Sequence, residues 1–173
     1  MAAFVLTLAA RVEAVEREQQ LGADAGPGIL VAAGKTEVGG AIAIHWTYGL
    51  TDAFNLMLEA SGSVLSLRNE GDATHQRPGW ILDADVGVGY VFDVLQWVPY
   101  AGVLVGGYGL SGGSLEGGTK ILPGAVVALG LDYRLTRTVA VGVALRQHML
   151  VTDTGNYPSF TQALARLETT WGW

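Results

Sequence analysis

The sequence predicts an all-β protein, an eight-stranded antiparallel up-and-down transmembrane β-barrel, from three observations. First, 50% of the 173 residues are hydrophobic and only 15% are charged, whereas about a quarter are charged in a soluble domain. Second, no apolar run approaches the roughly 20 residues that a transmembrane helix needs, and the 25 glycines disfavour helices throughout. Third, turn signals divide the chain into short segments. Because a bilayer admits only helices and closed barrels, apolar surface spread over short segments predicts a barrel.

The chain is expected to divide into two parts. Residues 1–17 are interpreted as an N-terminal tail or the remnant of a signal segment, and residues 18–173 as the barrel domain. The apolar run Ala2–Ala10 suggests the signal segment, although no Lys or Arg precedes it and no small-x-small cleavage site follows it.

Turn residues delimit the strands in chain order. Strands are expected at residues 18–33, 38–50, 54–67, 79–92, 97–111, 119–135, 138–150 and 158–173. Tight connections are expected at 51–53, 93–96 and 136–137, and longer ones at 68–79, 111–118 and 151–158. Only the connection 34–37 is short on the long-loop side. Short turns at one end opposite longer loops at the other are typical of outer-membrane barrels.

Alternation with a period of two assigns the faces of the strands. The apolar face carries pairs such as Ile42 and Ile44, Leu56 and Leu58, Val86 and Val88, Val143 and Leu145. The opposite face carries, in chain order, Asp24, His45, Glu59, Asp83, Asp85, Asp132, Arg134, Arg146, His148, Arg166 and Glu168. The strand at 97–111 is apolar on both sides, so its facing stays open. In an eight-stranded barrel the lumen is just wide enough for side chains to fill it. These eleven residues are therefore expected to form a lumen charge network that pairs its charges and plugs the barrel.

The aromatic residues distinguish a membrane barrel from a soluble sandwich. Ten of them lie near the short-turn ends of the strands: Trp46, Tyr48, Phe54, Tyr90, Phe92, Trp97, Tyr100, Tyr133, Trp171 and Trp173. On the long-loop side lie Trp80, Tyr108, Tyr157 and Phe160. A soluble core would hold its large aromatics in mid-strand, whereas a barrel in lipid places them in girdles at the two interfaces.

The C-terminal segment Leu167-Glu168-Thr169-Thr170-Trp171-Gly172-Trp173 alternates apolar residues and ends on an aromatic one. Together with the strand–turn–strand pattern at 90–100, it resembles the small eight-stranded bacterial outer-membrane barrels, the broad group of outer-membrane proteins A, X and W. The resemblance covers residues 18–173 and is architectural. It implies a bacterial outer-membrane location, surroundings of lipid bilayer and lipopolysaccharide, and a monomer or weak oligomer. It also implies that Leu167, Thr169, Trp171 and Trp173 form the signal read by the barrel assembly machinery. Family members usually end on Phe, and this chain ends on Trp.

The function expected from these features is that of a non-enzymatic outer-membrane barrel, structural or passing small molecules at a low rate. Two alternatives remain open. In the first, Arg146-Gln147-His148 resembles part of a lipid A deacylase, but such enzymes need a serine two residues after the His, and this chain has Leu150 there. In the second, the polar loop 68–79 binds a partner as an adhesin. A soluble barrel that carries a ligand would need the opposite facing, with an apolar interior.

No cofactor and no metal site are expected. The chain has no cysteine, which excludes thiolate ligands, and His45 and His148 show no paired ligand spacing. A net charge of −6 disfavours nucleic acid as a partner.

Overall fold

The computed structural model describes residues 17–32, 35–66, 78–92, 96–113, 115, 118–152, 154 and 159–172. Among these residues no helix is long and apolar enough to cross a membrane. The N-terminal segment expected at 1–17 lies, apart from Arg17, outside the described part of the chain.

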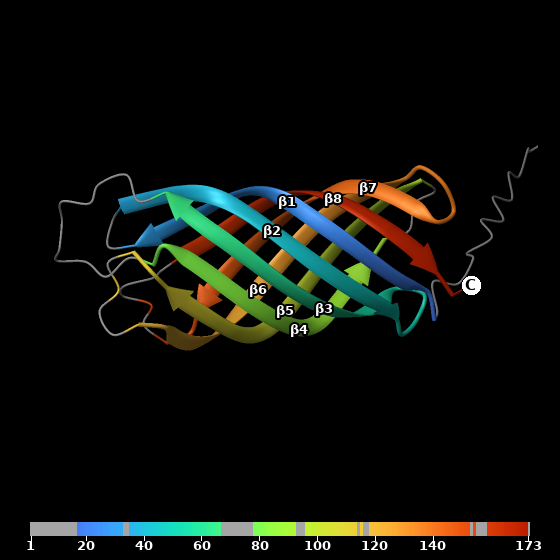
Figure 1. Cartoon of the computed structure of the whole chain (residues 1–173). Coiled ribbons are helices and arrows are strands. Elements are labelled where there is room, and N and C mark those ends of the chain that lie inside the picture. Colours follow the sequence, from blue (N-terminus) through green and yellow to red (C-terminus); the bar gives the residue numbers. More distant parts are fainter. Residues whose placement is uncertain are drawn as a thin grey trace, which may run out of the picture.

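The eight strands form a closed antiparallel barrel in sequence order (Figure 1), which confirms the fold class. Their bounds are β1 Gln19–Ala32, β2 Lys35–Gly49, β3 Phe54–Ser66, β4 Trp80–Val91, β5 Trp97–Ser111, β6 Lys120–Arg134, β7 Val139–Leu150 and β8 Ser159–Trp171. The last strand pairs with the first from Gln19↔Trp171 to Val31↔Ser159, so no sheet edge remains open. The largest difference from the expected bounds is in β2, which begins three residues earlier.

Two of the tight turns share one hydrogen-bond pattern. In the β2–β3 turn, the hydroxyl of Thr51 accepts a bond of 3.0 Å from the amide of Phe54. In the β6–β7 turn, Thr136 accepts a bond of 3.0 Å from Val139 in the same way. A threonine hydroxyl that takes up a backbone amide three residues on stabilises a short reversal of the chain. Both turns lie at the short-turn end of the barrel, where they connect neighbouring strands.

The outer surface of the barrel is apolar around its circumference. Large hydrophobic side chains stand exposed on every strand, among them Leu21, Ile42, Ile44, Leu58, Val64, Leu82, Val86, Val103, Val105, Ile121, Leu129, Val143, Leu145 and Leu167. Strand β5 has a clear facing: Val103 and Val105 point outward, while Leu104 and Tyr108 are buried inside. This is the inverse of a soluble barrel, whose exterior faces water.

Aromatic residues gather on the outer surface at the short-turn end. Phe54 packs against Tyr90 at 5.1 Å between ring centroids, and Trp97 against Tyr133 at 4.8 Å. The same end also carries Trp46, Tyr48, Phe92 and Trp171. Trp173 lies outside the described residues.

Tyr100 departs from the expected girdle. It is only 8% exposed because it shares the inward face of β5 with Leu104, and its ring occupies the space that the missing side chain of Gly130 leaves on β6. On the long-loop side, Tyr108 and Phe160 are likewise buried inside the barrel, and of the four aromatics expected there only Trp80 is seen to face outward. Tyr157 lies outside the described residues.

An arginine placed on the outer belt tests its contact with lipid. Val86 lies in the middle of β4 and is 45% exposed. Val86→Arg should lower the free energy of unfolding by about 2–4 kcal/mol, because the charge would lie near the bilayer midplane. Leu135→Arg, in the β6–β7 turn, should cost only about 0–1 kcal/mol. Urea unfolding in lipid vesicles measures both. Equal and small effects would mean that the outer face lies in water.

Candidate functional site: the charged interior

The interior of the barrel is layered along its axis. At the long-loop end, inward side chains from seven strands form an apolar layer, called here the apolar seal: Leu30, Leu65, Ile81, Leu110, Leu122, Leu150 and Phe160. Each of these side chains is at most 7% exposed. On β2 the buried residue opposite Leu30 is Glu37, which is 3% exposed, so the layer is apolar on seven strands and carries a carboxylate on the eighth.

Below the seal, Asp24 on β1 is the centre of an ionic network. Its Oδ2 atom accepts a bond of 2.5 Å from Nη2 of Arg146 on β7 and lies 3.1 Å from Nδ1 of His45 on β2. Arg146 also forms an ion pair of 2.9 Å with Glu59 on β3. Side chains from four strands are thereby joined in one buried ionic cluster.

Arg166 on β8 forms the second half of this network. Its Nη2 donates to Oε2 of Glu168 at 2.9 Å, and ion pairs at 3.6 and 3.5 Å join it to Asp24 and Asp132. Its guanidinium carbon lies 4.6 Å from the centre of the Tyr100 ring, a cation–π contact. Nε2 of His45 lies 3.0 Å from the same oxygen of Glu168, which links both halves.

Glycines on neighbouring strands make room for these side chains. An added Cβ at Gly22 would meet the His45 ring, one at Gly142 would meet Asp132, and one at Gly106 would meet Asp85. Each of these large inward side chains therefore packs against a glycine on the adjacent strand. An alanine at such a position would displace the charged group beside it.

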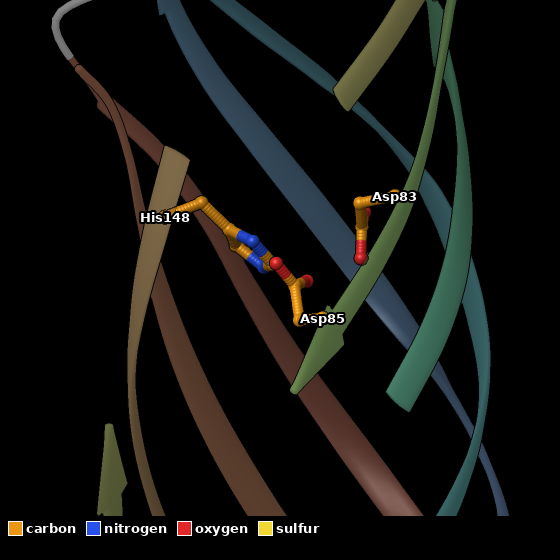
Figure 2. Close-up of side chains that lie close together, drawn as sticks. All are labelled: Asp83, Asp85 and His148. Carbon is orange, nitrogen blue, oxygen red and sulfur yellow. The ribbon is translucent and has the colours of Figure 1, made fainter. Parts of the chain in front are cut away.

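A third group of polar side chains lies between the seal and the ionic network. Asp83 and Asp85 on β4 and His148 on β7 each bring one ligand atom within 4.8 Å of the others, and Figure 2 shows Asp85 directed at the His148 ring. The hydroxyl of Tyr108 lies 3.0 Å from Nδ1 of His148. Ser61 donates to Asp83 at 2.6 Å. Carboxylate and imidazole groups in this arrangement can ligate a metal ion.

The short-turn end of the lumen contains a small cavity. It has a volume of about 30 Å³, room for one or two water molecules. Its walls come from both polar and apolar side chains, among them Gln20, Thr47, Asn55, Met57, Val98, Arg134 and Thr170. At this end of the lumen, the cavity between the described side chains has room only for isolated waters.

All eleven residues expected in the lumen point inward. Ten of them are buried. Arg134 lies near the short-turn end with its side chain 30% exposed, 3.8 Å from Glu18. Sequence reasoning missed Glu18, which precedes the first strand, and Tyr108, because the facing of β5 could not be assigned. It also missed the meeting of Asp83 and Asp85 with His148.

The requirements of the deacylase alternative are not met by the described residues. Nδ1 of His148 contacts Tyr108, and its Nε2 has no hydrogen-bond partner. The contacts of His45 are carboxylates and an arginine. No serine or threonine hydroxyl in the described part of the chain bonds either histidine, and Leu150 belongs to the seal. The loop 68–79, on which the adhesin alternative depends, lies outside the described residues up to position 77.

Comparison with solved structures identifies the fold. The chain resembles the Neisserial surface protein A, NspA, with a TM-score of 0.69 at 15% identity, covering 87% of this chain and 96% of that one. The N-terminal β-barrel domain of Pseudomonas aeruginosa OprF gives a TM-score of 0.61 at 15% identity, covering 90% and 98%. Ail, the attachment invasion locus protein of Yersinia pestis, gives 0.57 at 10% identity, covering 90% and 99%.

These structures are small eight-stranded outer-membrane barrels, so the resemblance seen in the sequence is confirmed at the level of the fold. No protein-family model matches the chain, and no curated protein matches it.

Removal of one arginine tests whether the interior charges act as a network. Arg146→Met should cost about 3–5 kcal/mol of unfolding free energy, because it leaves the buried carboxylates of Asp24 and Glu59 without their shared cation. Adding Glu59→Gln should recover part of that loss. A double-mutant cycle in urea should therefore give a coupling of about 0.5–3 kcal/mol. Strictly additive effects would show that the two side chains do not interact.

Proposed function

We propose that this chain is an integral outer-membrane barrel with a structural role, whose lumen is closed to solutes. The observation that carries the proposal is the apolar seal across the long-loop end of the lumen. Seven buried aliphatic and aromatic side chains meet there. An ion that entered this layer would lose its water shell and meet aliphatic and aromatic side chains on seven of the eight strands, with Glu37 on β2 as the charged exception.

The layers below the seal support the same proposal. The guanidinium groups of Arg146 and Arg166 lie across the lumen among carboxylates from several strands. Both arginine side chains are at most 2% exposed. Passage at a low rate, the other expectation from the sequence, would require a continuous polar path through both layers.

The chemistry of the outer surface supports the proposal that the barrel spans a membrane. The apolar belt surrounds the barrel, and aromatic pairs such as Phe54–Tyr90 lie outside at the short-turn end. Aromatic side chains of this kind favour the boundary between acyl chains and headgroups. Lipid and lipopolysaccharide are then the partners of the outer surface, with the barrel interior serving stability.

Electrical recording tests closure directly. The purified barrel, shown to be folded by faster gel migration unboiled than boiled, should give no stable conductance steps in planar bilayers, because the seal excludes ions. A general porin in the same bilayers provides the positive control. Regular conductance steps from folded protein would contradict a closed lumen. Solubility of the folded chain without detergent would contradict the membrane location.

Cysteine labelling locates the barrier, since the chain has no cysteine of its own. Ser63 lies inside the barrel and is 2% exposed. Ser63→Cys should react with a water-soluble maleimide at least roughly 100-fold more slowly than Thr136→Cys in the exposed β6–β7 turn, because a buried thiol is inert. Adding Leu30→Ser and Phe160→Ser should speed labelling at position 63. Fast labelling in the otherwise unchanged barrel would show that water already reaches the interior.

A further inference from the structure

The group formed by Asp83, Asp85 and His148 has the geometry of a metal site. The residues come from β4 and β7, three strands apart around the barrel, and their ligand atoms converge within 4.8 Å of one another. In Figure 2 the carboxylate of Asp85 points at the imidazole, and the carboxylate of Asp83 faces the same space. The three residues are 6%, 5% and 0% exposed. They form a buried set of donors aimed at a common centre.

Several ligand atoms of this group have no hydrogen bond, although Ser61 donates to Asp83 and Tyr108 interacts with both His148 and Asp85. Both carboxylate oxygens of Asp85, Oδ2 of Asp83 and Nε2 of His148 are buried without a hydrogen bond. Arg146 and Arg166 pair with Asp24, Glu59, Asp132 and Glu168, but no ion pair joins either arginine to Asp83 or Asp85 among the described residues. Two adjacent buried carboxylates without a cation are costly. The site therefore lacks positive charge.

We propose that Asp83, Asp85 and His148 bind one divalent transition-metal ion, with the chemistry of Zn²⁺, inside the barrel. Two carboxylates balance the charge of a divalent ion. The imidazole nitrogen favours Zn²⁺ and its neighbours in the first transition series over Mg²⁺ and Ca²⁺, which prefer oxygen ligands alone. The site does not depend on whether the lumen conducts.

Tyr108 supports this assignment by orienting the ring. Its hydroxyl lies 3.0 Å from Nδ1 of His148, so Nδ1–H can donate to the tyrosine oxygen. That bond leaves the lone pair of Nε2 free, and Nε2 is the nitrogen without a partner. Metal-binding histidines are commonly held by such a bond from the second nitrogen. Tyr108 is a positioning residue for this site.

Burial determines how the ion enters. The seal covers the site on one side and the ionic network covers it on the other, so the folded barrel offers no open path. The ion is then taken up while the strands close around it. Metal present during refolding should be retained, whereas metal added to the folded, metal-free barrel should bind much more slowly.

The test is refolding of metal-free, denatured chain into detergent with Zn²⁺, with Mg²⁺ or with a chelator, followed by gel filtration and elemental analysis. Barrel refolded with Zn²⁺ should carry about one Zn²⁺ per chain, and the Mg²⁺ sample should carry little Mg²⁺. Zn²⁺ should also raise the temperature at which the faster-migrating folded band disappears. Refolding with Co²⁺ should give visible absorption bands that report nitrogen and oxygen ligands.

Conservative variants assign the ligands. Asp85→Asn and His148→Gln should each reduce bound Zn²⁺ at least roughly tenfold, and His148→Gln should also alter the Co²⁺ spectrum. Asp132→Asn is the matched control, because it removes a buried lumen carboxylate that pairs with Arg166 outside the site. It should retain Zn²⁺. Without metal, Asp85→Asn should be more stable than the unchanged chain, since it removes one of two adjacent carboxylates.

Three results would overturn the proposal. Folded barrel that carries no Zn²⁺ after refolding in its presence would mean that protons alone neutralise the two carboxylates. Zn²⁺ that remains bound in both ligand variants would place it elsewhere. Equal loss in the Asp132→Asn control would show a general effect on folding. Because the gel shift reports barrel closure separately, none of these results would affect the proposed closed lumen.

Discussion

Closure of eight strands into a barrel fixes the width of the lumen, and the rest of the interior follows from that width. The space holds side chains and little else, so each large inward group needs a small neighbour. Tyr100 lies over Gly130, Tyr108 over Gly124 and His45 over Gly22. The glycine content is thus a packing requirement. It places the charged groups within bonding distance of each other across the lumen.

The narrow lumen also determines how the buried charges are stabilised, because it leaves little room for water to solvate them. Each buried charge must be matched by another side chain. Asp24 is matched by His45, Arg146 and Arg166 at once, which makes it the residue on which the network depends. Asp83 and Asp85 both lie on β4, next to the strand of Glu59, and no ion pair joins them to an arginine among the described residues. The shortage of cations is local, and it coincides with His148, whose Nε2 is buried without a hydrogen-bond partner.

Much of the fold could be predicted from the sequence because its signals are local. Turn residues and alternation placed the strands to within a few residues. The facing of β5 could not be predicted, because apolar residues occur on both of its sides, Val103 and Val105 outside and Val98 and Leu104 inside. Tyr100, Tyr108 and Phe160 were expected at the membrane interfaces because each lies near the end of a strand. Position along a strand does not show which face of the strand a ring occupies. The proximity of Asp83 and His148 depends on the stagger of strands around the whole barrel, which no local pattern reveals.

A closed lumen raises the question of why its interior is polar at all, since an apolar filling of equal volume is often as stable as buried ion pairs. The membrane-facing side of each strand must be apolar, so apolar inward residues as well would create long continuous apolar runs. Such runs approach the hydrophobicity of a transmembrane helix. Polar inward residues interrupt them in β3, β4, β7 and β8. Strand β5, apolar on both faces, is interrupted by Gly102, Gly106, Gly107 and Gly109 instead. The charges inside the barrel then follow from the need to keep each membrane-spanning strand less hydrophobic than a transmembrane helix. Because these charges pair across the lumen, such a sequence can still form a stable fold.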